Sequence, residues 1–218
     1  MNEPCERRAG EAYLALAGRV GADVSHEVRN VLSVIGECAG LLSDLVGLAE
    51  KGRPLNCAEL KKLSASIAGQ VKRGTATMER FSRFAHAADE PVASFDLGAL
   101  VENVAALAQR RVALAGCRLE AEPPGQAIPM RGDPFALQYL LFSAIDALLE
   151  PLENGEVVRV GVARRGPAAA VCISGPAVGD RSGPIRQQLS DAVEECRGSV
   201  ETSFAGGVIS LILTVPIE

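Results

Sequence analysis

The sequence contains no tryptophan, and aromatic residues make up only 4% of its 218 positions. Proteins that bind single-stranded nucleic acid stack its bases on aromatic rings, and a net charge of −5 does not attract a phosphate backbone. No uninterrupted apolar run approaches the roughly 20 residues that cross a bilayer. The first ten residues are charged and lack the apolar core of a signal peptide. We therefore expect a cytoplasmic protein that binds neither nucleic acid nor a membrane.

Histidine is almost absent too, with two residues in the chain, and six cysteines stand far apart at positions 5, 38, 57, 117, 172 and 196. No two cysteines form a Cys-x-x-Cys pair, and no cysteine–histidine cluster has the spacing of a zinc site. In a cytosolic setting this pattern predicts reduced, mostly buried thiols and no metal bound by the protein.

Two long amphipathic helices are predicted in the first 90 residues. The first spans about residues 6–49 and ends at Lys51-Gly52-Arg53-Pro54, and the second runs from an N-cap at Asn56 to about residue 88. Each carries an apolar stripe, made in the first helix by Val20, Val28, Val31, Ile35, Cys38, Leu42 and Val46. A single hairpin leaves that stripe half covered. We therefore expect an antiparallel hairpin over residues 1–90 that pairs with a second copy into a four-helix bundle, giving a homodimer.

The pattern changes after Pro91, and residues 91–218 are predicted to form a second domain. Helices are expected at about residues 97–112, with Asp96 as N-cap, at 134–149, starting at Asp133-Pro134, and at 184–197. Strands are expected at 117–121, 156–163 and 169–174, with a closing hairpin of 200–203 and 208–216 around Gly206-Gly207. Because helices and strands mix without strict alternation, the fold class is α+β, with helices on one face of a sheet.

The first helix carries one of the two histidines in the stretch Val24-Ser25-His26-Glu27-Val28-Arg29-Asn30. His26 lies roughly 200° around the helix from Val24, so its imidazole is expected on the polar face, where it is a competent nucleophile near neutral pH. That face is rich in polar and small residues, so another protein could approach it closely. The partner interface predicted around His26 comprises Arg19, Ala22, Arg29, Ser33, Glu37 and Gly40.

The stretch Ser-His-Glu-Val-Arg-Asn-Val-Leu resembles the H-box of two-component sensor histidine kinases. The resemblance implies that His26 is phosphorylated on a ring nitrogen and that Glu27 orients the ring and acts as base. It also implies that Asn30 positions water for dephosphorylation of a partner. The family usually has proline where Val31 stands. That proline commonly kinks the helix, so the difference concerns whether the helix bends locally.

The second domain resembles the ATP-binding domain that follows the H-box in those kinases. Gly132-Asp133-Pro134 with Leu137-Gln138-Tyr139-Leu140-Leu141 resembles the start of the N-box helix, and the stretches 200–203 and 213–216 resemble the last two strands. By this resemblance the domain is an α/β sandwich like that of the kinase ATPase domain.

Several residues that kinases use for ATP are replaced. Asp146 stands at the position of the metal-binding asparagine, and is otherwise explained as a surface residue of an amphipathic helix. Ile173 replaces the aspartate that accepts a hydrogen bond from adenine, which leaves the adenine amino group unpaired at a cost on the order of 1–3 kcal/mol. Ala177 replaces a glycine, and only a few residues stand where a lid and a second glycine-rich box are needed. The domain is therefore expected to be degenerate, with no cofactor bound by this chain.

The leading hypothesis is a histidine phosphotransferase of a phosphorelay. His26 would take a phosphoryl group from the aspartate of one response-regulator receiver domain and pass it to another, with magnesium supplied by the receiver. The alternatives are a divergent kinase with residual ATP use and a non-catalytic pseudokinase adaptor that binds a receiver or kinase. A receiver phosphatase that uses Asn30 is compatible with the leading hypothesis.

Overall fold

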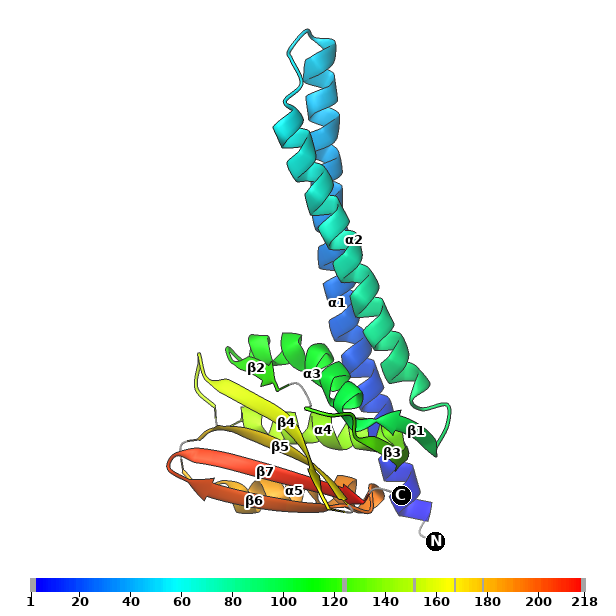
Figure 1. Cartoon of the computed structure of the whole chain (residues 1–218), viewed down its shortest axis with the longest axis vertical. Coiled ribbons are helices and arrows are strands. Elements are labelled where there is room, and N and C mark those ends of the chain that lie inside the picture. The colour runs from blue at the N-terminus through cyan, green and yellow to red at the C-terminus, as the bar shows by residue number, and fades with distance from the viewer. Residues whose placement is uncertain (1–2, 123–124, 151, 167, 178, 217–218) are drawn as a thin grey trace. The chain divides into compact units, whose positions relative to one another are not determined.

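The computed structural model in Figure 1 describes residues 3–122, 125–150, 152–166, 168–177 and 179–216, with side chains from residue 10 onward. Residues 19–81 form one compact unit. The first 18 residues and the chain from Ser82 onward form the other.

The residue 19–81 unit is a hairpin of two helices, taken from α1 (Glu3–Glu50) and α2 (Cys57–His86). The predicted cap is confirmed, because the Asn56 side chain accepts hydrogen bonds from the backbone N–H groups of Ala58 and Glu59 at 3.0 and 3.4 Å. The two helices approach closely where Val31 meets Gly74: a Cβ built on that glycine would lie 3.2 Å from the valine Cγ1. Gly74 of α2 is therefore a packing position.

The apolar stripe is only partly covered within this hairpin. Val20, Val31 and Cys38 are buried, as predicted, but Val46 is 52% exposed. Further large apolar side chains of both helices are also well exposed, namely Leu32, Leu41, Val71 and Met78. The hairpin thus keeps the uncovered apolar surface from which the homodimer is predicted, and dimerisation stays a prediction.

Helix α1 bears on the expectation that no segment crosses a membrane. Its segment Gly10–Glu50 is long and apolar enough to cross a membrane by length and composition. Glu37 and Asp44 interrupt the apolar residues of this segment, so that no long apolar run exists although the average hydropathy is high. The buried residues of that helix face α2: the Cys38 thiol, for instance, lies 3.5 Å from the Ser66 hydroxyl. The absence of a membrane partner stays a prediction.

The C-terminal domain is α+β, in agreement with the sequence. A five-stranded sheet has the order β2-β4-β5-β7-β6, in which β2 and β4 are parallel and the other pairs antiparallel. Its strands are Arg118–Ala121, Val157–Arg165, Ala168–Pro176, Ser199–Ala205 and Val208–Pro216, for β2, β4, β5, β6 and β7. The helices are α3 (Leu97–Leu114), α4 (Pro134–Leu149) and α5 (Ser182–Glu195).

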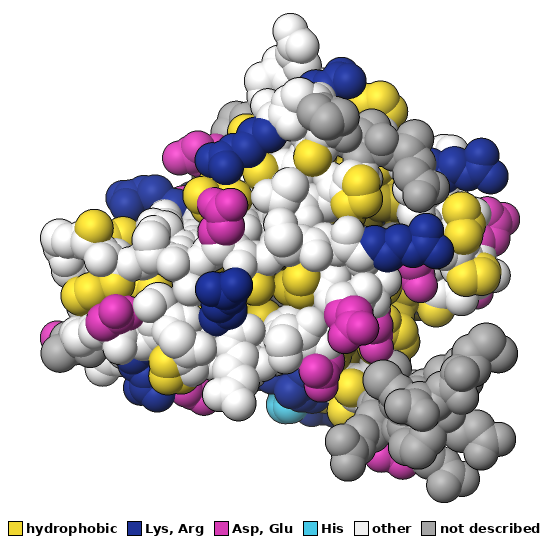
Figure 2. Space-filling model, turned by 90° about the horizontal axis from the view of Figure 1, so that it is seen from below, with side chains coloured by type: hydrophobic (Ala, Val, Ile, Leu, Met, Phe, Trp, Pro, Cys, Tyr) yellow, Lys and Arg dark blue, Asp and Glu magenta, His cyan; other side chains and the backbone are white. Residues whose placement is uncertain are grey.

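The three helices lie on one face of this sheet (Figure 1). Burial alternates along β7, where the side chains of Ile209, Leu211, Leu213 and Val215 are buried and those between them are less so. This alternation is what a sheet with one covered face requires. Figure 2 shows the molecule from below, where basic and acidic side chains are interspersed.

The helix starts predicted at Asp96 and Asp133 are confirmed, since each carboxylate accepts backbone N–H groups of the first turn. Asp96 also accepts from the backbone N–H of Ile128, at 2.7 Å. A second, two-stranded sheet was not predicted: β1 (Ala93–Asp96) pairs antiparallel with β3 (Pro129–Gly132). Each strand has four residues, too few for an alternating pattern to stand out.

An aromatic cluster ties the ends of the long helices into the C-terminal domain. Tyr13 of α1 stacks edge-on against Phe135 and Tyr139 of α4, and its hydroxyl donates to the Glu195 carboxylate of α5. Phe84 of α2, 1% exposed, packs on the Phe135 ring with centroids 5.5 Å apart. These contacts place residues up to 18 and from 82 onward in one compact unit, whereas the sequence predicts domains at 1–90 and 91–218.

Candidate functional site

His26 lies exposed on α1, as its position on the helical wheel predicts. Within the part of the chain that the structure describes, its imidazole makes no hydrogen bond or ion pair. Both ring nitrogens are therefore accessible to solvent or to a docked protein. An imidazole in this state can attack an electrophile without first breaking an internal contact.

Glu27, the residue beside it, is held from the other helix. Arg73 of α2 places both its Nε and one terminal nitrogen 2.6 Å from the Glu27 Oε1 atom. The Glu27 side chain is 22% exposed and that of Arg73 is 60% exposed. An ion pair this accessible contributes little to stability, about 0–1 kcal/mol. Its effect is positional, because it restricts the carboxylate next to His26.

Asn30 and the predicted partner residues are all on the surface. Asn30 is exposed one turn after His26, and the Ser25 hydroxyl donates to the Gly21 carbonyl oxygen at 2.7 Å, so it is directed along its own helix. The six residues predicted to face a partner, Arg19, Ala22, Arg29, Ser33, Glu37 and Gly40, are each exposed. The structure therefore leaves the whole predicted surface around His26 open to a partner.

A shallow apolar groove runs along α1 and α2 beside these residues. It has a volume of about 500 Å³ and is lined by Gly21, Val24, Ser25, Val28, Arg29, Leu32, Met78 and Phe81. Leu32 is 61% exposed there. The groove is the part of the uncovered apolar stripe nearest in sequence to His26.

Arg73 could not be identified as a site residue from the sequence. The basic residues of the second helix include Lys72, Arg73 and Arg80, and nothing in their spacing distinguishes the one that reaches Glu27. Only the register of the two helices, fixed by packing such as that of Val31 on Gly74, selects Arg73. The sequence shows acidic and basic residues on the two facing helices, but it does not show which acid pairs with which base.

The position that the kinase resemblance assigns to adenine recognition is filled by a core residue. Ile173 lies in the middle of β5, between Val160 of β4 and Leu211 of β7, and its side chain is fully buried. The glycine two residues later is also covered, because a Cβ on Gly175 would lie 3.3 Å from the Leu152 side chain. Ala177 donates its backbone N–H to the Gly207 carbonyl oxygen at 2.9 Å.

Asp146 is not the free surface residue that the amphipathic pattern suggests. Its carboxylate accepts a hydrogen bond from Arg111 of α3 at 2.9 Å, and the two side chains are 23% and 27% exposed. The carboxylate that would be available to a metal ion is thus engaged by a cation. No cluster of three or more His, Cys, Asp or Glu side chains that could hold a metal occurs among the described residues.

The second histidine, two glycines and the cysteines have structural positions. His86 is exposed, and its Nδ1 lies 2.7 Å from the Asp89 carboxylate. Gly179 has φ +83°, as a turn glycine does, and a Cβ on Gly198 would lie 2.7 Å from the Thr214 carbonyl oxygen. The described cysteines are free thiols, as predicted; Cys38 and Cys117 are buried, whereas Cys57 is exposed.

No protein-family description matches this sequence, and no curated protein matches it at a significant level. Among solved structures, a histidine kinase from Burkholderia phymatum STM815 matches with a TM-score of 0.52 and 16% identity, over 92% of this chain and 97% of that one. Histidine kinase ThkA in complex with the response regulator protein TrrA matches with a TM-score of 0.51 and 16% identity, over 100% of this chain and 68% of that chain.

The catalytic domain of ThkA alone matches with a TM-score of 0.51 and 12% identity, over 59% of this chain and 99% of that chain. Likenesses at this level of identity establish the fold. The chain has a histidine-kinase-like fold, with a long helical region followed by the mixed sheet and helices of an ATPase-like domain.

Proposed function

We propose that this protein is a histidine phosphotransferase that carries a phosphoryl group between receiver domains through His26. The observation that carries the proposal is the site on α1: an exposed imidazole with no partner among the described residues, beside a carboxylate that Arg73 holds in place. In the proposed reaction a ring nitrogen of His26 attacks the phosphorus of an aspartyl phosphate. The bond from phosphorus to the aspartate oxygen breaks, and the aspartate leaves as a carboxylate.

The second half of the reaction reverses the first on another receiver. The aspartate carboxylate of that receiver attacks the phosphorus, and His26 leaves as the neutral imidazole. Glu27 has the proposed role of accepting the ring N–H, which fixes the ring orientation and stabilises the positively charged imidazole formed during transfer. Asn30 has the proposed role of positioning water when the net result is loss of phosphate. The acidic pocket of the receiver would supply magnesium.

The C-terminal domain supports transfer without ATP. An adenine amino group placed at Ile173 would meet a fully buried aliphatic side chain, and Asp146 is already paired with Arg111. A buried donor without an acceptor costs about 1–3 kcal/mol. An aspartyl phosphate is already an activated donor, so the proposed reaction needs no nucleotide.

A homodimer is part of the proposal. The apolar surface of residues 19–81 includes Leu32, Val71 and Met78, each about half exposed or more. Pairing two hairpins would bury these side chains in a four-helix bundle, as the sequence pattern predicts. Light scattering at micromolar concentration measures the mass, and a monomer would contradict this part of the proposal.

The test is phosphotransfer from a radiolabelled, phosphorylated receiver, with wild type compared with His26→Ala. Loss of labelling in that variant is expected, with unchanged circular dichroism because the side chain is exposed. Ser43→Ala, an exposed position of the same helix outside the predicted partner interface, is the matched control for labelling at His26. Labelling that persists in His26→Ala would refute the assignment of the site.

Variants of the neighbouring residues separate their roles. Arg73→Gln is expected to slow transfer while the protein stays folded, and Glu27→Ala to slow it further. Asn30→Ala should keep labelling of His26 but slow net receiver dephosphorylation. Calorimetry with magnesium–ATP tests the kinase alternative: a low-micromolar dissociation constant would favour a divergent kinase. Absence of labelling with every receiver tried would favour the adaptor.

A further inference from the structure

Strand β6 forms one end of the five-stranded sheet, with β7 as its neighbour (Figure 1). It pairs with β7 in continuous register, from Ser199 opposite Thr214 to Ala205 opposite Val208. The outer side of an edge strand presents backbone N–H and C=O groups that have no neighbour within the sheet. The outer side of β6 is therefore a place where a strand of another chain could add to the sheet.

The turn between β6 and β7 determines which backbone groups point outward. Gly206 and Gly207 form a two-residue turn, with φ +59° and +75°. In such a hairpin the two flanking residues, here Ala205 and Val208, exchange hydrogen bonds, and bonded and non-bonded pairs then alternate along the ladder. The residues whose N–H and C=O groups point away from β7 are therefore Val200, Thr202 and Phe204.

No described residue bonds to this outer side. In the part of the chain that the structure describes, Val200, Thr202 and Phe204 make no hydrogen bond to any element other than β7. The opposite edge of the sheet differs, because the Gln109 side chain of α3 donates to the Leu119 carbonyl oxygen of β2 at 2.8 Å. One edge of the sheet thus has a side chain bound to it, and the other is open.

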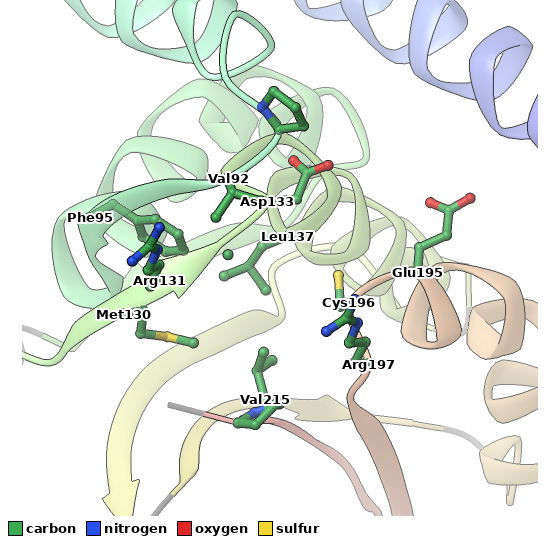
Figure 3. Close-up of a pocket in the computed structure, with 13 residues that line it drawn as sticks. Val92, Phe95, Met130, Arg131, Asp133, Leu137, Glu195, Cys196, Arg197 and Val215 are labelled. Atoms are coloured by element: carbon green, nitrogen blue, oxygen red, sulfur yellow. The ribbon is translucent and has the colours of Figure 1, made fainter. Parts of the chain in front are cut away.

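Strand β6 also lacks the features that usually prevent edge strands from pairing. Such strands tend to be very short, to contain proline or a bulge, or to carry several charges. β6 has seven residues, no proline and one charged residue, Glu201. A cavity of about 190 Å³ lies where α5 leads into β6, lined by Cys196, Arg197, Leu137 and Val215 among others (Figure 3). No residue of β6 lines it, so it does not involve the open edge.

The outward groups of β6 match those of a second copy in one antiparallel register. If Thr202 lies opposite Thr202 of the second copy, then Val200 lies opposite Phe204, and Phe204 opposite Val200. Each of these three pairs can exchange two hydrogen bonds, because both of its residues point their backbone groups outward. A shift of two residues leaves only two such pairs, and a shift of one residue places outward groups opposite inward ones.

The side chains of β6 fit the same register. On the helix-covered face, Val200 would meet Phe204 of the second copy, and both side chains are partly exposed in the single chain. Apolar and aromatic cross-strand pairs of this kind stabilise a sheet. On the open face, Glu201 would lie opposite Ser203 of the second copy, so that no two carboxylates face each other directly.

We infer that β6 pairs antiparallel with β6 of a second copy, centred on Thr202, and joins two five-stranded sheets into one. This contact lies outside the hairpin of residues 19–81 and requires neither His26 nor phosphotransfer. A chain that also pairs through its hairpin would have two different contacts with other copies. Its mass would then rise beyond that of a dimer as the protein concentration increases.

Analytical ultracentrifugation of the full chain between about 10 µM and about 1 mM measures this association. The average mass should rise by at least about half across the range, and a smaller rise would overturn the inference. Amide hydrogen exchange identifies the strand. The N–H groups of Val200, Thr202 and Phe204 should exchange more slowly at the higher concentration, whereas those of Glu201 and Ser203, which already bond to β7, should change little. Unchanged exchange at the three outward groups would also overturn it.

Charge substitutions on the open face test the register. Ser203→Glu would place a carboxylate directly opposite Glu201 of the second copy, in two symmetric pairs, and should weaken association about tenfold. Ser199→Glu is the matched control: the position is exposed on the same face of β6 but lies opposite Ala205 in this register, so association should stay within about twofold. Equal effects of the two substitutions, or no effect of Ser203→Glu, would overturn the inference.

A charge exchange completes the test. Adding Glu201→Lys to Ser203→Glu turns both like-charge pairs into pairs of opposite charge, and should restore association to within about threefold of wild type. Association that stays as weak as in Ser203→Glu alone would contradict the proposed pairing. Labelling of His26 by a phosphorylated receiver should be the same in all these variants. The mass and the labelling therefore report separately on β6 pairing and on the proposed phosphotransfer.

Discussion

Removing the Tyr13 hydroxyl tests how the first helix is attached to the C-terminal domain. Tyr13→Phe keeps the ring against Phe135 and Tyr139, at centroid distances of 5.2 and 5.0 Å, and removes only the hydrogen bond to Glu195. A hydrogen bond to a charged group contributes about 1.5–3 kcal/mol, and the exposure of Glu195 reduces this to about 1 kcal/mol. For a unit of this size, that corresponds to a fall in Tm of about 2–4 °C.

The same substitution has a pH signature. Burial, together with the hydrogen bond to Glu195 and the charge of that residue, raises the pKa of Tyr13 well above its ordinary value of 10. The folded protein therefore keeps this tyrosine protonated where the unfolded chain would ionise it. Its contribution to stability is fully present below pH 10 and is lost as the pH rises above 10, by up to about 1 kcal/mol at pH 11 once its partial exposure is allowed for.

Urea unfolding of wild type and Tyr13→Phe at pH 7, 9, 10 and 11 measures both effects. The wild type should be more stable by about 1 kcal/mol at pH 7, and the difference should shrink or change sign by pH 11. Other groups that titrate in this range, such as the thiols, occur in both proteins and cancel in the difference. A difference that stays constant from pH 7 to 11 would refute the reasoning.

Three further outcomes are expected. Phe84→Ala should destabilise the C-terminal unit by about 3–5 kcal/mol, measured by calorimetry, because the ring is 1% exposed and its removal leaves a cavity. Gly198→Ala should lower the urea midpoint, since its Cβ would lie 2.7 Å from the Thr214 carbonyl oxygen; an unchanged midpoint would contradict that close approach. Cys196, with a pKa raised to about 12, should react with a thiol reagent at pH 8 far more slowly than the exposed Cys57, which peptide mapping after timed labelling measures.

Much of the fold could be predicted because its signals are local. The caps at Asn56, Asp96 and Asp133 are short polar side chains placed directly before apolar periodic segments, and each does cap a helix. The closing hairpin around Gly206-Gly207 likewise combines a turn signal with flanking apolar residues. In such cases one stretch of sequence contains both the element and its boundary.

The features that were missed depend on pairs of distant residues. The β1–β3 sheet joins Ala93 to Gly132, and the Glu27–Arg73 pair joins two helices. The Arg111–Asp146 pair joins α3 to α4, so the sequence showed an acid at a kinase position but not the cation that occupies it. The exposure of His26 followed from one helical wheel, whereas its neighbour across the hairpin followed only from the register of two helices.

The burial of Ile173 limits which substitutions could lead this domain to bind a nucleotide. Introducing an adenine-binding aspartate by Ile173→Asp would place a carboxylate at a fully buried position between Val160 and Leu211, at a cost of several kcal/mol. Freeing Asp146 for a metal would leave Arg111 half-buried without its partner. If the chain uses no nucleotide, as proposed, each single step toward nucleotide use would lower stability before it gave any benefit, so successive substitutions would not readily lead there.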